Sequence, residues 1–134
     1  MFSVTVRDFI SSAHFLREYK GKCENMHGHN WQVEVTLEKQ GLGPDGMVMD
    51  FKILKGYIKE ITDELDHKVL NELEAFEDVN PSAENIARHI FKQVQERILG
   101  SNCRVAKVDI WEQRDSCASY FEPPVVEEKK RALE

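Results

Sequence analysis

Two stretches of the chain alternate between apolar and polar residues, which is typical of a strand with one buried face. They cover residues 2–6 and residues 28–38. Residues two apart in a strand project to the same side, so His27 and His29 point the same way. The alternation continues in phase from these histidines through four apolar residues, Trp31, Val33, Val35 and Leu37. We therefore predict that both imidazoles lie on the inward side, at the head of a half-buried strand.

The first strand brings a third histidine into the same phase. Val4 and Val6 mark its apolar face, and His14 falls on that face if the strand continues without a bulge. Residues 15–22 break the alternation and predict a loop between the two strands. A run rich in glycine, proline and aspartate over residues 39–46 ends the second strand.

Two helices are expected next, each with apolar residues at helical spacing. Asp50 is the expected N-cap of the first helix, which ends near Asp66. The second helix is expected to start at residues 80–81, an asparagine followed by proline, and to stop near Gly100. The buried stripes comprise Phe51, Leu54, Tyr57, Ile58, Ile61 and Leu65 in the first helix, and Ala83, Ile86, Ala87, Ile90, Val94 and Ile98 in the second.

The last part of the chain predicts two more strands, over residues 106–112 and 116–121, joined as a hairpin. Glu112 is unusual there, because this carboxylate falls in phase with the apolar face. The order strand, strand, helix, helix, strand, strand predicts an α+β fold, a four-stranded antiparallel sheet with two helices on one face. We expect one domain over residues 1–121, a flexible tail over 122–134, and an oligomer in which exposed sheet edges pair.

Composition narrows the classes of partner. The 134 residues carry a net charge of −6, which gives no broad attraction for nucleic acid or an anionic membrane surface. No apolar run approaches the roughly 20 residues that a membrane helix needs. The three cysteines are an odd number, which argues against a disulfide framework and for a reducing compartment, the cytoplasm.

The three histidines are the strongest chemical signal in the sequence. His14, His27 and His29 together predict a zinc site with an open fourth position, the arrangement typical of catalysis. The competing interpretation is that His27 and His29 only cap a strand. Cys23 lies four residues before His27, and the residues alone leave it open as a fourth zinc ligand, a nucleophile, a base or a passive thiol.

Carboxylates supply a second set of candidates. Asp66 can fix the tautomer of His67 and make it a better proton carrier, although a charged pair also suits the end of a helix. Glu112 can accept two parallel hydrogen bonds from a ligand, or can form a buried salt bridge. Ser82 and Glu84 suit the first turn of a helix whether or not they bind anything.

Taken together, these residues resemble the 6-pyruvoyl-tetrahydropterin synthase family, which includes the 6-carboxy-tetrahydropterin synthases. The similarity covers about residues 1–121. The motifs that carry it, each weak alone and specific in this order, are Ser12-Ala13-His14, Cys23-x3-His27-Gly28-His29, Gly46-Met47-Val48-Met49-Asp50, Leu65-Asp66-His67-Lys68, Leu70-Asn71, Pro81-Ser82-Ala83-Glu84-Asn85 and Trp111-Glu112.

The resemblance implies a tunnelling fold whose trimers stack into a homohexamer, with 7,8-dihydroneopterin triphosphate as substrate. It implies that zinc is held by the three histidines, and that Cys23 is the catalytic base rather than a ligand. Asp66 and His67 would complete a proton relay with Cys23. Glu112 would bind the N–H edge of the pterin, and the pocket would be lined by Ser82 and Glu84.

The short gap between Cys23 and His27 is similar to that of the bacterial 6-carboxy enzymes. It favours formation of 6-carboxy-5,6,7,8-tetrahydropterin with release of acetaldehyde and triphosphate, on the route to queuosine and other 7-deazapurines. One alternative is a 6-pyruvoyl-tetrahydropterin synthase, which eliminates triphosphate only. An alternative of another class is a non-catalytic zinc module, in which Cys23 closes a site of four protein ligands.

Overall fold

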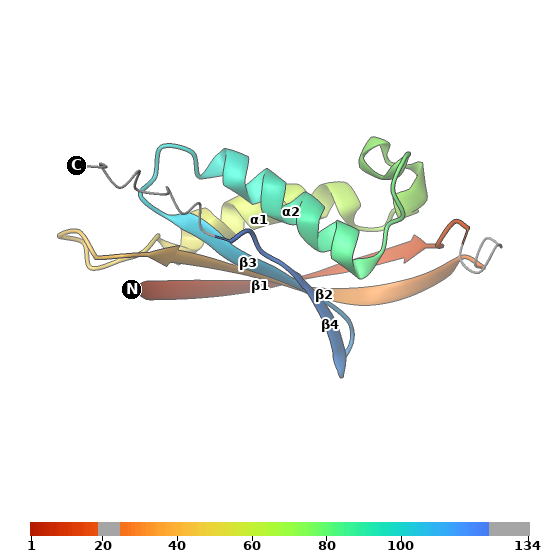
Figure 1. Ribbon diagram of the computed structural model, residues 1–134, viewed down its shortest axis with the longest axis horizontal. Helices are drawn as coiled ribbons and strands as arrows, with labels where there is room; N and C mark the ends of the chain where they lie inside the picture. Colours follow the sequence, from red (N-terminus) through yellow and green to blue (C-terminus); the bar gives the residue numbers. More distant parts are fainter. Residues whose placement is uncertain (19–24, 124–134) are drawn as a thin grey trace, which may run out of the picture.

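The computed structural model describes residues 1–18 and 25–123. Four strands form one sheet with the order β1-β2-β3-β4, every neighbouring pair antiparallel, and both helices cover the same face (Figure 1). The predicted sheet, the two helices and the order ββααββ are confirmed. The elements are β1 (Phe2–His14), β2 (His27–Lys39), α1 (Phe51–Leu65), the 3-10 turns η1 (Leu70–Glu72) and η2 (Glu74–Phe76), α2 (Ala83–Arg97), β3 (Arg104–Gln113) and β4 (Ser116–Tyr120).

The pairing of β1 with β2 determines where the histidines lie. The register runs from Phe2 opposite Lys39 to His14 opposite His27 without a shift. The inward phase of β1 therefore persists to the end of the strand, and His14 is 3% exposed. The prediction that the first strand brings His14 to the interior shared with His27 and His29 is confirmed.

The core lies between the helices and the inward face of the sheet. The Asp50 side chain accepts a hydrogen bond from the Lys52 amide, 2.7 Å away, so the predicted cap of α1 is confirmed. From α1 the buried residues are Leu54, Ile58, Ile61, Thr62 and Leu65, and from α2 they are Ile86, Ala87, Ile90, Phe91 and Val94. These stripes meet the inward face of β2 and β3, where Val33, Val35, Leu37, Val108 and Ile110 are buried.

Three details of the predicted elements are wrong. Phe51, the first residue of α1, is 52% exposed rather than buried. The strand predicted over residues 106–112 begins earlier, at Arg104, and a shift in the β2–β3 register leaves Val105 buried. The cap of α2 is Ser82 rather than Asn80, since the Ser82 hydroxyl accepts from an amide in the first turn.

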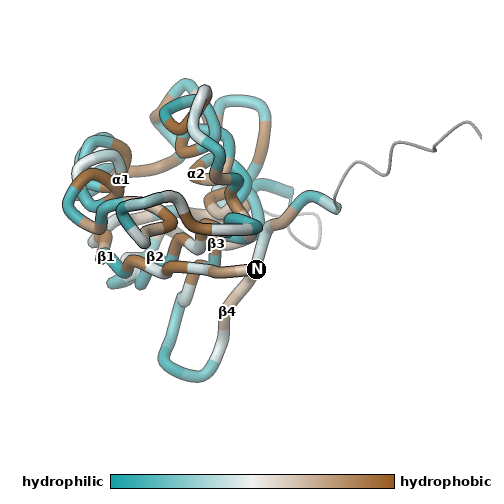
Figure 2. The backbone as a smooth tube through the Cα atoms, turned by 90° about the vertical axis from the view of Figure 1, so that its left-hand side faces the viewer, coloured by the Kyte–Doolittle hydropathy of each residue, from teal (hydrophilic) through white to brown (hydrophobic). Residues whose placement is uncertain are grey.

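The opposite face of the sheet carries no helix among the described residues. Figure 2 shows both helices on one side and the β3–β4 hairpin projecting away from them. Within residues 1–18 and 25–123, no helix combines the length and the apolar character needed to cross a membrane. The chemistry-bearing histidines lie on the helix-covered side, at the end of β1 and the start of β2.

Candidate active site

Four potential ligands meet where β1 ends and β2 begins. One nitrogen each from His14, His27 and His29 and one carboxylate oxygen of Glu112 all lie within 4.8 Å of one another. His14 is buried and the other three are partly buried. Strand alternation places the histidines on one face, and Glu112 follows Trp111, which pairs with Gln32 of β2. The cluster can therefore hold a metal ion with donors from three strands.

Backbone carbonyls fix the tautomers of two of these histidines. His14 Nδ1 lies 2.6 Å from the Pro81 oxygen, and His27 Nδ1 lies 2.9 Å from the Asn25 oxygen. A carbonyl oxygen only accepts, so each Nδ1 carries the proton and donates it. Each neutral ring then presents the lone pair of Nε2 to the cluster. Metal-binding histidines typically have this second hydrogen bond, which orients the ring.

The geometry between the two rings favours a cation. His14 Nε2 and His27 Nε2 are 3.0 Å apart, with ring centroids 4.6 Å apart. Two lone pairs that face each other at this distance repel, unless a proton or a metal ion is attracted to both. His29 completes the set, with its ring centroid 4.7 Å from that of His27. Three neutral imidazoles are donors that suit zinc, so the residues present fit the group.

Glu112 lies against the histidines, a position that its predicted role of binding the pterin did not require. Its Oε1 lies 2.8 Å from His29 Nε2 and 3.9 Å from His14 Nε2. The Glu112 side chain is 38% exposed, so this carboxylate lies at the border between the cluster and solvent. It can accept hydrogen bonds from a ligand that enters there.

Asp66 and His67 form a hydrogen-bonded pair just after α1. Asp66 Oδ2 lies 2.8 Å from His67 Nδ1, and Asp66 Oδ1 accepts from the Ser11 amide, also at 2.8 Å. The Ser11 amide and then the His67 ring hold the pKa of the Asp66 carboxyl below its ordinary value of 3.8. Asp66 is therefore ionised at neutral pH and can orient the His67 ring.

The backbone of His67 is unusual. Its φ is 55°, in the left-handed region that non-glycine residues seldom adopt. The His67 amide donates to the Ser11 oxygen at 2.6 Å, which ties this conformation to β1. His67 and His29 both line an open hollow of about 490 Å³ beside the ends of β1 and β2. This hollow therefore joins one residue of the pair, His67, to one residue of the cluster, His29.

Of the remaining predicted site residues, the structure describes Ser82 and Glu84. Ser82 caps α2, and Glu84 is exposed on its first turn. Ser82 directly follows Pro81, whose carbonyl contacts His14. Cys23 lies outside the described residues. Sequence reasoning missed the carbonyls of Asn25 and Pro81, because a backbone oxygen leaves no residue-type signal.

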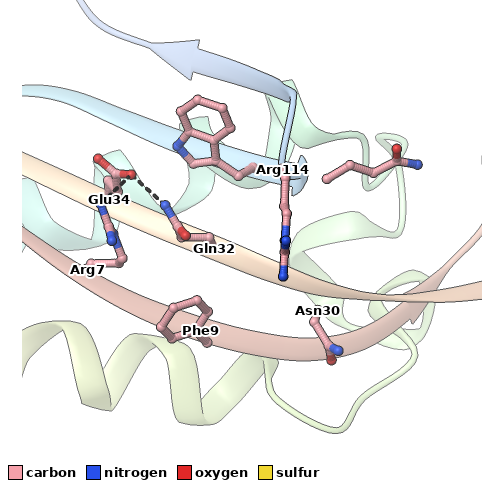
Figure 3. Close-up of a pocket in the computed structure, with 8 residues that line it drawn as sticks. Arg7, Phe9, Asn30, Gln32, Glu34 and Arg114 are labelled. Carbon is pink, nitrogen blue, oxygen red and sulfur yellow. Dashed lines mark hydrogen bonds and ion pairs between the residues drawn. The ribbon is translucent and has the colours of Figure 1, made fainter.

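The uncovered face of the sheet carries a second hollow, of about 590 Å³ (Figure 3). Trp111, Gln113 and the labelled residues of Figure 3 line it. Glu34 lies 3.4 Å from Arg7 and accepts from Gln32 at 2.6 Å, so its charge is largely satisfied. This hollow is larger than the one beside the histidines, and Asn30 lines both. The chemistry of the side chains, rather than cavity size, identifies the candidate site.

Comparisons with known proteins support the family resemblance that the sequence motifs indicate. The family model for 6-pyruvoyl tetrahydropterin synthase matches residues 3–123. A 6-carboxy-5,6,7,8-tetrahydropterin synthase of Synechocystis is 33% identical over 119 residues, with 85% of this chain and 88% of that protein covered. A dihydroneopterin monophosphate aldolase of Pyrococcus furiosus is 35% identical over 89 residues, with 66% of this chain and 72% of that protein covered.

Solved structures agree on the fold. The 6-pyruvoyl tetrahydropterin synthase of Caenorhabditis elegans has a TM-score of 0.80 at 27% identity, with 91% of this chain and 96% of that chain covered. The family model, which covers residues 3–123, spans both helices and the four strands apart from Phe2. The chain belongs to the 6-pyruvoyl tetrahydropterin synthase family and is homologous to the 6-carboxy-5,6,7,8-tetrahydropterin synthases.

Proposed function

We propose that this protein is a zinc-dependent lyase that converts 7,8-dihydroneopterin triphosphate and water to 6-carboxy-5,6,7,8-tetrahydropterin, acetaldehyde and triphosphate. The observation that carries the proposal is the convergence of the Nε2 atoms of His14 and His27, 3.0 Å apart, beside the ring of His29. Family membership supplies the substrate class. The three-residue gap between Cys23 and His27, together with the name of the Synechocystis relative, favours the 6-carboxy product.

Each residue of the site has a role in this proposal. His14, His27 and His29 hold zinc through Nε2 atoms. Bound zinc polarises the hydroxyl groups of the substrate side chain and acidifies the adjoining C–H bonds. Cys23, as a thiolate, removes a carbon-bound proton.

The Asp66–His67 pair exchanges protons with the reacting side chain. Asp66 remains ionised, so it stabilises the imidazolium that forms when the His67 ring takes up a proton. The exposed position of His67 on the hollow shared with His29 allows this exchange. Cys23 and the pair together form the proposed proton relay.

Glu112 anchors the pterin ring in the proposal. His29 Nε2 must lose its proton to become a ligand, and Glu112 Oε1, 2.8 Å away, then accepts from another donor. A pterin presents two neighbouring N–H donors that match the two oxygens of a carboxylate. Ser82 and Glu84 line the same pocket, and the working assembly is a homohexamer of two trimers.

A product assay tests the function directly. Zinc-loaded protein is incubated with 7,8-dihydroneopterin triphosphate and, separately, with dihydroneopterin monophosphate, because the Pyrococcus relative is named for the monophosphate. The expected result is a 6-carboxy pterin and acetaldehyde from the triphosphate alone. A 6-pyruvoyl product, or cleavage of the monophosphate, would assign the site to a different reaction of the same family.

The non-catalytic zinc module is tested by Cys23→Ala. If Cys23 is the base, the variant keeps its zinc and loses turnover. If Cys23 closes a structural site, the variant loses zinc, and the wild-type protein converts neither pterin. Metal content and turnover measured on one preparation separate the two roles.

A further inference from the structure

Two asparagine side chains continue the pairing of β1 beyond His14. The Asn71 amide group accepts from the Phe15 amide at 3.0 Å and donates to the Phe15 carbonyl at 2.9 Å. Asn80 repeats the arrangement on Arg17, accepting at 2.8 Å and donating at 3.1 Å. Each side chain thus makes the two hydrogen bonds that a neighbouring strand would make. The segment after His14 is held against residues 71–80.

The Arg17 side chain ties the same segment together from the other direction. Its Nη1 donates to the carbonyls of Phe76 at 2.8 Å and Val79 at 3.2 Å, and its Nη2 donates to that of Asn71 at 3.1 Å. A guanidinium presents several donors in a rigid plane, so one side chain can bind carbonyls from separate turns. Arg17, Asn71 and Asn80 are called the clasp below.

The clasp adjoins the residue whose carbonyl binds His14, one of the proposed zinc ligands. Asn80 is followed by Pro81, whose carbonyl accepts from His14 Nδ1 at 2.6 Å. The Asn80 carbonyl is itself bound by Asn85 Nδ2 at 2.9 Å, and the proline ring fixes its own φ. The peptide that carries the Pro81 oxygen is therefore held on both sides. His14 and Pro81 are 67 positions apart in the chain, so their contact depends on these bonds.

We propose that Arg17, Asn71 and Asn80 are positioning residues for His14. By holding the Pro81 carbonyl at Nδ1, the clasp keeps the proton on that nitrogen and leaves Nε2 as the donor to the metal. This inference rests on the metal site of the proposed function but not on the reaction. Hydrogen bonds to the second nitrogen of a ligating histidine typically change metal affinity by about 10–100-fold.

The test is the zinc affinity of Asn80→Ala, measured by competition with a chromophoric chelator. We expect zinc to bind about 10-fold more weakly or worse, since the Pro81 carbonyl loses its tether to the strand. Asn102→Ala is the matched control, because Asn102 is exposed before β3. Its affinity is expected to equal that of the wild type. An unchanged affinity in Asn80→Ala would overturn the proposal.

A second readout separates positioning from general stability. Long-range nitrogen–proton NMR of the metal-free protein reports which nitrogen of His14 is protonated. We expect Nδ1–H alone in the wild type and a mixture of both tautomers in Asn80→Ala. A lower melting temperature with one tautomer and full zinc affinity would show a purely structural clasp.

Arg17→Gln provides a separate variant if Asn80→Ala does not fold. It removes the guanidinium but leaves both asparagine pairs with the backbone, and the same two measurements apply. We expect weaker zinc binding and mixed tautomers, and wild-type values would overturn the proposal. If the wild type binds zinc tightly yet converts no pterin, the proposed reaction fails, while the clasp is still judged by affinity and tautomer.

Discussion

His14, His27 and His29 stand on two regular strands, whereas His67 follows the end of a helix with φ 55° and a side chain that is 81% exposed. The first group has its ring centroids within about 5.3 Å of one another, while the His67 ring contacts the Asp66 carboxylate. The two regions contain the same side chain, yet the surroundings prepare it for different chemistry.

The difference lies in what holds Nδ1. In the cluster, His14 and His27 donate from Nδ1 to neutral backbone carbonyls, which fix the tautomer of each ring. A neutral imidazole is the form that binds metal. His67 Nδ1 instead lies 2.8 Å from the Asp66 carboxylate, a negatively charged partner. The two regions therefore differ in the charge of the group that orients the ring: a neutral carbonyl for His14 and His27, a carboxylate for His67.

The largest expected effect comes from breaking the cluster with His27→Ala. Removal of one of three neutral donors leaves two, so we expect loss of bound zinc and a fall in turnover of roughly 1,000-fold or more. Metal analysis and the product assay measure both. His89→Gln is the control, since His89 packs on Phe76 away from the cluster. Retention of zinc and turnover in His27→Ala would remove this histidine from the metal site.

Asp66→Asn makes the surroundings of His67 resemble those of the histidine cluster, because a neutral amide replaces the carboxylate. The amide no longer stabilises the imidazolium, so we expect turnover to fall about 100-fold or more. Zinc content is expected to stay at the wild-type level. Asp63→Asn, an exposed aspartate that pairs with Lys59 on α1, is the matched control. Loss of zinc in Asp66→Asn would contradict the division of roles.

The two regions also differ in how far the sequence could predict them. Strand alternation has an exact period of two, so the shared face of His27 and His29 followed from spacing, and an unbroken β1 extended it to His14. The hydrogen bond between Asp66 and His67 was expected because the residues are neighbours in the chain. The left-handed backbone of His67 was not, since it depends on Ser11, which is distant in sequence.

Competition between partners explains the main errors of prediction. Asn80 has the side chain of a helix cap, but in the fold its amide pairs with Arg17 and the cap passes to Ser82. Local propensity could not decide this, because both asparagine and serine cap helices well. For Glu112 the sequence left both a ligand contact and a salt bridge open, and its proximity to His29 depends on the β2–β3 register.

The strain at His67 predicts a smaller effect, on stability. At φ 55° an alanine has the steric penalty of the left-handed region, and a glycine does not. The unfolding free energy of His67→Gly should therefore be about 1 kcal/mol higher than that of His67→Ala. Urea unfolding of the two variants measures the difference. The same two substitutions at Glu64, in α1, are expected to give the opposite order. Glu64→Gly should have a lower unfolding free energy than Glu64→Ala, because glycine weakens a helix. An advantage for alanine at position 67 would show that the backbone there relaxes.

The smallest expected effect is the pH dependence of the Asp66 pair. The folded-state pKa of Asp66 is below its ordinary value of 3.8, so its stabilising contribution is complete above that value and is lost as pH falls through the folded pKa. The Ser11 amide, which donates to Asp66 Oδ1, should report this titration by NMR with a midpoint below 3.8. The melting-temperature difference between the wild type and Asp66→Asn, both metal-free, should narrow over the same acidic range. A midpoint above 3.8 would mean that the Ser11 amide does not hold the carboxylate, and the region would lose the fixed charge that distinguishes it from the cluster.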